Sequence, residues 1–474
     1  MVPPSFALVR RPSVQPRQWQ TRLIQLLRAR LGQASSEGHD VLIHAGPGAG
    51  KTLGALLGVE QLLREGRLQR FVVFCHRTAI ARQWVQAAAR LQLELAEWPG
   101  TSTAPGLLLS YQTAALHRAR LLEQLQAWEP SPWLAIADEV HHLGLDPDEP
   151  EAAAWGHAFA TLSRSAALRL GLTGTPFRAD QLAFCAARQV QVRDGDALVW
   201  RIMPDLCVEP RQLIAAGDVR PLEFRFQDGW VDHARTAGDD AERSCLSAEN
   251  RESWRARNLR RAIRLADSSS IAQRVLLQAR DRLEQVRQQH AGAGGLVIAR
   301  DIAHARRLAD LLNEQGESAQ LVHSLDPEAE QRLAAFQRGE GDWLVSIDMC
   351  SEGFDAPRIR VVAYLSTVVT RSRFVQAITR AVRLDGGREA SEPVPRHPSY
   401  VFAPADPLLI SHARSWSLSE PYLLRGRSTA AAAEAGGGHW SPSTPLAAVA
   451  DGAGSVIAMN GPQLPTFVQQ PRPA

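Results

Sequence analysis

The sequence predicts an α/β protein with two tandem parallel-sheet domains, and three observations support this fold class. Short apolar runs, which fit buried parallel strands, alternate with helical patterns in two separate stretches of the 474-residue chain. A glycine-rich loop directly follows the first apolar run and leads into a helical pattern. An Asp-Glu pair ends a later run, at the sheet edge where open α/β folds bind ligands.

The first domain is expected over residues 1–215. Its strands are short apolar runs, which suit a parallel sheet covered by helices on both faces. The expected strands are 41–45, 71–75, 106–110, 133–137 and 168–172.

A second domain of the same kind is expected over residues 291–405. Residues 216–290 are polar and rich in arginine, so we expect a mainly helical linker between the two domains. Residues 406–474 are rich in Ala, Gly, Pro and Ser with few charges, so we expect a low-complexity, largely disordered tail. The strands of the second domain are expected near 296–299, 344–347 and 361–365.

Lys51 is the only lysine among the 53 basic residues, so arginine fills every other position of fixed positive charge. It lies in a loop that reads Ala-Gly-Pro-Gly-Ala-Gly-Lys-Thr and begins at Ala45. A compact ammonium fits between phosphate oxygens in a tight loop, whereas the wider, planar guanidinium does not. The retained lysine therefore indicates an active phosphate site.

The residues around Lys51 have the chemistry of a phosphate-binding loop. Glycines let backbone N–H groups approach phosphates, and the N-terminus of the following helix favours anions. The hydroxyl of Thr52 is the expected Mg²⁺ ligand. Ala45 replaces a glycine, so the G-x-x-x-x-G-K-[ST] pattern is missed by one residue. The expected phosphate-binding residues are Gly46, Gly48, Ala49, Gly50, Lys51 and Thr52.

Asp138 and Glu139 directly follow an expected strand. Asp138 is expected to hold Mg²⁺, and Glu139 to orient and deprotonate the attacking water. An isolated Asp-Glu pair is more often a solvated strand end, but the phosphate loop upstream favours the catalytic interpretation. His141 and His142 do not predict a zinc site, because adjacent side chains on extended backbone point to opposite sides and no partner ligands are suitably spaced.

A further set of candidate residues lies in the second domain. Gln376, Thr379, Arg380 and Arg383 are spaced i, i+3, i+4 and i+7, which places them on one face of a helix. Two arginines on that face can reach a γ-phosphate across a cleft between domains and stabilise transition-state charge. The alternative is a solvated basic stripe, and the order of the other motifs favours the catalytic role.

With these motifs in this order, the chain resembles a superfamily 2 helicase or translocase of the DEAD/DEAH-box type over roughly residues 14–405. The resemblance implies two RecA-like lobes that bind ATP and Mg²⁺ between them. Nucleotide would favour closed lobes and hydrolysis would release them, so nucleic acid spanning both would advance in each cycle. The motifs are Gly46–Thr52 (motif I), Asp138–His141 (II), Thr173–Pro176 (III), Asp348–Pro357 (V) and Gln376–Arg383 (VI).

The resemblance assigns roles to further residues. Arg17 and Gln20 match the upstream element that reads adenine, with Gln20 as the base contact, and Gly353 and Asp355 are expected to line the nucleotide interface. Thr379 departs from the family pattern, which has glycine there, and this change is expected to affect turnover rate. Nucleic-acid contacts are implied for His76, Arg77, Gln83, Ser110, Tyr111, Gln112 and Ser351.

Two segments bear on the nucleic-acid partner. Residues 211–221 resemble the segment that leaves the first lobe in restriction-subunit-like DNA translocases, which favours DNA over RNA. Four arginines between residues 257 and 264 share a helical face near Trp254 and could track a nucleic-acid backbone. The alternative is a solvated helix whose Trp254 packs into the core.

The composition limits the compartment and the chemistry. A net charge of +3 and a pI near 8.7 permit nucleic-acid binding without requiring it. The five cysteines are scattered and form no C-x-x-C pair, which argues against a disulfide framework and favours a reducing compartment. No apolar run is long enough to span a bilayer, so we expect a cytoplasmic protein without membrane contact.

Three classes of function remain open. The favoured class is an ATP-dependent helicase or translocase. The second is the motor subunit of a restriction or defence complex, with the nuclease on another chain, because the only lysine is needed in the phosphate loop. The third is a nucleotide-dependent interaction switch that does not move along a strand.

Overall fold

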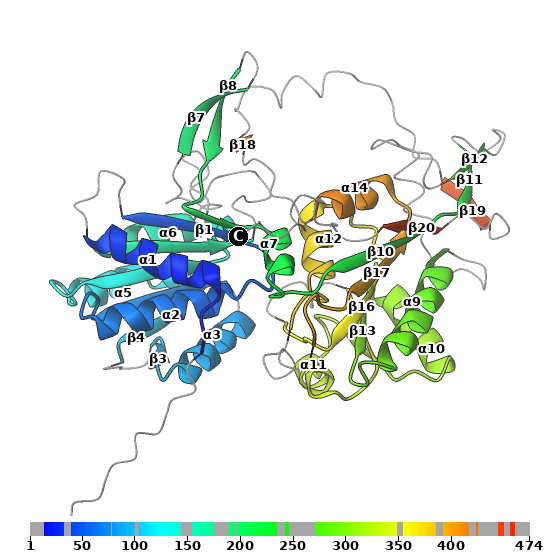
Figure 1. The fold of residues 1–474 in the computed structure, drawn as a ribbon, viewed down its shortest axis with the longest axis horizontal. Helices are drawn as coiled ribbons and strands as arrows, with labels where there is room; N and C mark the ends of the chain where they lie inside the picture. Colours follow the sequence, from blue (N-terminus) through cyan, green and yellow to red (C-terminus); the bar gives the residue numbers. More distant parts are fainter. Residues whose placement is uncertain are drawn as a thin grey trace, which may run out of the picture.

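The computed structural model describes two α/β lobes and the segment that joins them (Figure 1). Core positions alternate along the strands, as the pleat requires. The described residues are 14–32, 39–76, 78–99, 104–143, 154–174, 189–194, 197–234, 242–245, 271–347, 354–384, 392–416, 423–424, 444–449 and 456–459.

The first lobe contains a seven-stranded sheet in which all neighbouring strands are parallel. The five strands expected from the sequence are present, with two short strands added at the edges. The order is β3 (Leu95–Glu97), β4 (Gly106–Ser110), β2 (Arg70–Cys75), β5 (Trp133–Asp138), β6 (Leu168–Thr173), β1 (Asp40–Ala45) and β9 (Leu206–Val208).

Helices cover both faces of this sheet. Val41 and Ile43 of β1 pack into one hydrophobic core, whereas Leu42 between them packs into the other. The first core receives α1 (Gln18–Gly32), α2 (Lys51–Arg64) and α3 (Thr78–Arg90), and the second receives α4 (Tyr111–Leu116), α5 (Arg118–Gln126) and α6 (Ala154–Leu162).

The second lobe also contains a seven-stranded sheet, with helices packed against it. Its strands are parallel except β20, which pairs antiparallel with β10. The order is β14 (Ala319–Val322), β15 (Trp343–Ser346), β13 (Gly294–Ile298), β16 (Ile359–Tyr364), β17 (Ser399–Pro404), β10 (Leu222–Gln227) and β20 (Val456–Met459). Its helices are α9 (Ile271–Arg287), α10 (Ile302–Glu314), α11 (Ala329–Arg338), α12 (Arg371–Ile378) and α14 (Pro407–Ser415).

The expected helical linker over 216–290 is corrected, because β10 is a strand of the second sheet and α9 packs against β16 and β17. Strand β10 was not expected because strands were sought at apolar runs. Its buried Leu222, Phe224 and Phe226 alternate with polar residues instead. The expected tail is corrected in part as well. Helix α14 contacts α12, and β20 extends the second sheet.

The chain crosses between the lobes after β9. The short helix α7 (Pro210–Ala215) lies between the two sheets in Figure 1, and β10 follows it. Two small antiparallel sheets lie outside the lobes, one of β7 (Gln189–Asp194), β8 (Ala197–Ile202) and β18 (Leu423–Leu424), the other of β11 (Trp230–Ala234), β12 (Glu242–Cys245) and β19 (Thr444–Val449). Within the described ranges, every helix is too short or too polar to cross a bilayer.

Candidate functional site

The loop between β1 and α2 turns sharply at two glycines. Gly48 and Gly50 have φ angles of 77° and 79°, which lie in the left-handed region that residues with a Cβ rarely adopt. Gly50 is the N-cap of α2, so the helix begins at Lys51 and Thr52 is its second residue. The helix N-terminus is thereby placed at the carboxyl end of β1, as a phosphate site requires.

Side chains from the start of α1 and the residue before it hold this loop by its carbonyl groups. In a trans peptide the carbonyl and the following N–H point in opposite directions. Captured carbonyls of Ala49 and Gly50 therefore direct the N–H groups of Gly50 and Lys51 to the other side, as in an anion-binding nest. The bonds are Arg17 Nη1 to Gly48 O (2.7 Å), Trp19 Nε1 to Ala49 O (3.0 Å) and Gln20 Nε2 to Gly50 O (3.0 Å).

Gln20 is buried, and both ends of its amide have protein partners. Its Oε1 accepts from Arg17 N at 2.8 Å while its Nε2 donates to the loop. The role of Trp19 was not foreseen, because a tryptophan in an amphipathic helix ordinarily reads as core. Its indole N–H nevertheless makes the middle of the three loop contacts.

The Lys51 ammonium lies where the ends of β1, β5 and β6 meet. Its Nζ is 3.4 Å from Ala45 O and 3.6 Å from Glu139 Oε1. A Cβ built on Gly174, just after β6, would lie 3.8 Å from Nζ. Gly174 therefore lies beside the ammonium. The structure thus brings together three motifs that are far apart in the sequence.

Asp138 is buried and fixed by hydrogen bonds. Trp84 Nε1 donates to its Oδ2 at 2.8 Å, and Glu139 N donates to its Oδ1 at 3.0 Å. Burial and the negative charge of Glu139 raise the pKa of the Asp138 carboxyl, while Lys51 opposes the shift. Tyr111 donates its hydroxyl to Asp138 O at 2.6 Å and has no exposed surface, so its side chain supports this strand end.

Glu139 has φ of 49°, in the left-handed region, and precedes the 3₁₀ turn η1 (Val140–His142). A residue with a Cβ pays strain there, which commonly marks a functional position. The turn aims the carboxylate at Lys51 rather than along the strand. The adjacent carboxylates of Asp138 and Glu139, with Lys51 beside them, form an acidic centre that a divalent cation would neutralise. Asp138 and the hydroxyl of Thr52 have the oxygen chemistry that Mg²⁺ prefers.

Arg383 of the second lobe lies against the phosphate loop of the first. A Cβ built on Gly48 would lie 3.8 Å from Arg383 Cγ and 3.5 Å from Val382 Cγ2. The guanidinium of Arg383 forms an ion pair with Asp355 at 2.9 Å. A predicted catalytic arginine and a predicted interface carboxylate are therefore neighbours at the contact between the lobes.

Arg380 is positioned differently from Arg383. It is buried, and its Nη1 donates to Phe354 O at 2.6 Å, so it holds the segment that carries Asp355. The predicted helical face over residues 376–383 is corrected, because α12 ends at Ile378 and Thr379, Arg380 and Arg383 lie beyond it. Thr379 is the C-cap residue and is buried, and its hydroxyl donates to Val375 O at 2.6 Å. The departure from glycine is thus accommodated without an unsatisfied hydroxyl. Gln376, which lies on α12, is half-buried.

His44 is a site residue that the sequence analysis missed. Its Nε2 donates to Gly174 O at 2.8 Å, and its Nδ1 lies 3.3 Å from Cys207 Sγ. Burial, opposed by that backbone bond and joined by the charges of Lys51 and Arg371, lowers the pKa of His44 to about 4. A histidine inside an apolar strand carries no sequence signal for this contact.

The predicted nucleic-acid residues lie near the carboxyl ends of β2 and β4. The His76 ring stacks on His142 with centroids 4.1 Å apart, and Gln112 is exposed. Ser110 caps α4 by accepting from Thr113 N at 2.9 Å. Gln83 is half-buried on α3. Outside the described residues lie Arg77, Thr175, Pro176, Ser351, Gly353 and the arginine cluster of residues 257–264 with Trp254.

Comparisons with known proteins agree with this arrangement. Residues 13–178 match the family described as "Type III restriction enzyme, res subunit", and residues 278–385 match the "Helicase conserved C-terminal domain". The chain is 32% identical over 424 residues to an uncharacterized protein of Mycobacterium tuberculosis, covering 86% of this chain and 64% of that one. It is 23% identical over 355 residues to the putative helicase 22 of a Sulfolobus islandicus filamentous virus, covering 72% and 58%.

Two solved structures share the fold. A fragment of a putative HsdR subunit of a type I restriction enzyme from Vibrio vulnificus has a TM-score of 0.52 at 17% identity, covering 86% of this chain and 67% of that one. An ATP-dependent type ISP restriction-modification enzyme bound to DNA has a TM-score of 0.51 at 12% identity, covering 82% and 27%.

These findings define the class. In residues 13–178 and 278–385 the chain carries two domains of the superfamily 2 helicase and translocase type. The chain is similar to restriction-enzyme subunits in its first family match and in both solved structures. It spans about 64% of the length of the mycobacterial relatives that it matches.

Proposed function

We propose that the protein hydrolyses ATP between its two lobes and uses the cycle to move along DNA. The observation that carries this proposal is the position of Arg383 beside the phosphate loop, where its Cγ lies 3.8 Å from the place a Cβ on Gly48 would occupy. A triphosphate on that loop would have Lys51 on one side and a guanidinium from the other lobe nearby. Such a charge acts on the transferred phosphoryl group, where negative charge develops in the transition state.

Each site residue of the first lobe has a distinct role in this proposed reaction. The loop N–H groups and Lys51 bind the β- and γ-phosphates. Glu139, which faces Lys51 from 3.6 Å, orients the attacking water and accepts its proton. Thr52 and Asp138 would hold Mg²⁺, which when bound neutralises phosphate charge. Asp138 is already fixed by Trp84, so its carboxylate needs no rearrangement to serve.

In this proposal the first lobe binds the nucleotide and an arginine of the second lobe contacts its γ-phosphate. The arrangement of the lobes therefore depends on whether that phosphate is present. Arg383 is paired with Asp355 at 2.9 Å, so ATP would compete with that carboxylate for the guanidinium. A ligand that prefers one arrangement shifts the population toward it. We infer that this shift advances nucleic acid held by His76, Gln83, Ser110 and Gln112.

DNA is proposed as the partner rather than RNA, and the cytoplasm as the compartment. The DNA proposal is supported by the restriction-subunit likeness and by the DNA-bound state of the type ISP neighbour. The direct test is ATP hydrolysis by the purified chain alone and with single- or double-stranded DNA or RNA. Stimulation by DNA is expected, and an absence of hydrolysis under all conditions would sink the proposal.

A second candidate is favoured by the same family match: the chain acts as the motor of a restriction or defence complex whose nuclease is a separate polypeptide. Purification from its native host with a nuclease bound would support it. Hydrolysis that no nucleic acid alters, together with nucleotide-dependent binding of another protein, would instead favour an interaction switch.

A further inference from the structure

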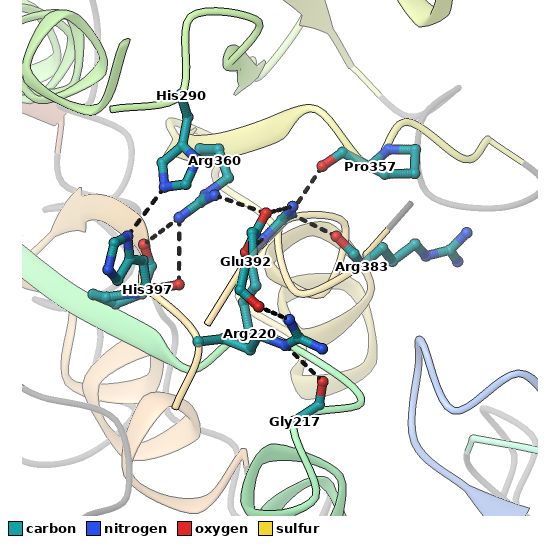
Figure 2. Close-up of polar contacts among 10 residues, drawn as sticks. Gly217, Arg220, His290, Pro357, Arg360, Arg383, Glu392 and His397 are labelled. Carbon is teal, nitrogen blue, oxygen red and sulfur yellow. Dashed lines mark hydrogen bonds and ion pairs between the residues drawn. The ribbon is translucent and has the colours of Figure 1, made fainter. Parts of the chain in front are cut away.

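The segment that links the lobes contains a buried arginine outside the family motifs. Arg220 lies between α7 and β10, and its side chain is 1% exposed. Figure 2 shows it at the centre of a polar network that joins residues from four separate stretches of the second lobe. A fully buried guanidinium is costly unless each of its donors is used, so its contacts indicate what it is for.

Arg220 binds the ends of two motifs at once. Its Nη1 donates to Arg383 O at 2.5 Å and to Pro357 O at 2.8 Å. Its backbone N–H donates to Val382 O at 2.9 Å. The main chain on both sides of the Arg383 Cα is therefore fixed by one residue, and so is the end of the segment that carries Asp355.

The rest of the guanidinium is neutralised by Glu392. Arg220 Nη2 and Nε lie 2.7 and 3.2 Å from the two Glu392 oxygens, a bidentate geometry that fixes the plane of the guanidinium. Arg360 shares that carboxylate at 3.3 Å, and Arg396 donates to the Glu392 backbone carbonyl. The arrangement leaves Arg220 no freedom to rotate away from Arg383 O.

The residues just before Arg220 contact the phosphate loop. Val219 Cγ1 would lie 3.0 Å from a Cβ on Gly48, and Asp218 lies 3.3 Å from Arg17, which itself donates to Gly48 O. Residues 218–220, here called the connector, therefore touch the loop on one side and the backbone of Arg383 on the other. Three consecutive residues define the spacing between the two halves of the site.

We propose that Arg220 is a positioning residue that sets where Arg383 meets the γ-phosphate. This inference rests on the proposed ATP hydrolysis. Its physical basis is that transition-state stabilisation by a fixed charge falls steeply with misplacement, roughly 100-fold for about 1 Å. Nucleotide binding depends instead on the loop and Lys51, which Arg220 does not touch. Loss of Arg220 should therefore lower turnover and spare affinity.

The experiment compares Arg220→Met with Arg360→Met in the full chain. Arg360 is a matched control because it is also buried, shares the Glu392 carboxylate, and donates to His397 O and Pro398 O of a different segment. Melting temperature, ATP affinity by titration, and kcat per folded molecule are measured for both. We expect a similar fall in melting temperature, but a loss of kcat of about 10- to 100-fold for Arg220→Met alone, with affinity within about threefold.

Arg220→Lys covers the case in which Arg220→Met does not fold. It keeps a positive charge for Glu392, but a single ammonium cannot match the fork that engages two carbonyls and a carboxylate. A folded Arg220→Lys with wild-type kcat overturns the inference, and so does an equal loss of kcat in Arg360→Met. Wild-type protein that hydrolyses no ATP would instead remove the proposed function on which the inference rests.

Discussion

The two lobes hold their functional groups in different ways. In the first lobe, side chains at the start of α1 bind the carbonyls of the phosphate loop, and all of those contacts lie within the lobe. In the second lobe, Arg383 is fixed through its backbone by the connector, while its guanidinium rests on an Asp355 side chain that is 47% exposed. The proposed nucleotide-binding groups are therefore fixed within one lobe, whereas the position of the proposed catalytic arginine depends on how the lobes meet.

This difference predicts that changes in the two lobes affect different quantities, the affinity for nucleotide and the rate of its hydrolysis. An exposed ion pair such as Arg383–Asp355 contributes little stability, so the guanidinium can exchange the carboxylate for a phosphate at small cost. A loop held by buried donors has no such freedom. Changes in the first lobe's loop supports should therefore appear in nucleotide affinity, and changes at Arg383 should appear in turnover.

The strongest test removes the chemistry of the first lobe while keeping its binding. Glu139→Gln is isosteric but cannot accept the proton of the attacking water, so ATP hydrolysis should fall by about 10²- to 10⁴-fold. ATP affinity, measured by titration, should stay near wild type. Lys51→Ala is the comparison variant, since it should abolish hydrolysis and weaken affinity together. Substantial turnover by Glu139→Gln would refute its role as the base.

Arg383→Ala tests the second lobe and should have the next largest effect. Hydrolysis should fall by about 100- to 1,000-fold, because a transition-state charge is lost, while nucleotide affinity is largely kept. Arg338→Ala is the control, because Arg338 is an exposed arginine of the same lobe that pairs only locally with Glu340. Unchanged kcat in Arg383→Ala would remove this arginine from the site and end the contrast between the lobes.

The pKa of His44 depends on both lobes, because burial lowers it most and the charges of Lys51 in the first lobe and Arg371 in the second lower it further. With a folded pKa of about 4 against 6.5, the unfolded chain binds more protons between these values. The contribution of neutral, buried His44 to the free energy of unfolding is therefore present above pH 6.5 and lost as the pH falls toward 4.

Between pH 7 and 5 this linkage should remove about 2 kcal/mol of unfolding free energy. His44→Gln keeps a donor for Gly174 O without titrating, so its melting temperature should vary less across that interval. Cys207, the other neighbour of the ring, stays unchanged in both proteins. Equal pH dependence of the two melting curves would contradict the assignment.

The smallest expected effect comes from Trp19→Phe. The phenyl ring retains most of the packing but loses the indole N–H that holds Ala49 O, a loss of about 1 kcal/mol. Since the contact orders the loop, ATP should bind about five- to tenfold more weakly, with kcat at saturating ATP near wild type. A variant that keeps its affinity but loses kcat would reverse the division between the lobes.

Much of the architecture was predictable, because each strand of the first lobe that lies inside the sheet is a mainly apolar run. Strand β10 was missed because strands were expected only at apolar runs, whereas its Phe residues alternate with Glu and Arg, which is the pattern of a half-exposed strand. The phosphate loop and the Asp-Glu pair were identified by local spacing, whereas the helix expected to carry Arg380 and Arg383 ends at Ile378. Arg220 carried no such signal, because its partners are backbone carbonyls more than a hundred residues away.

The single lysine has a practical consequence. The Lys51 side chain is 13% exposed, and no other side chain in the protein offers a primary amine. An amine-selective reagent therefore has one side-chain target, and bound nucleotide would shield it. Mass spectrometry of the labelled chain could report site occupancy directly, without an introduced probe.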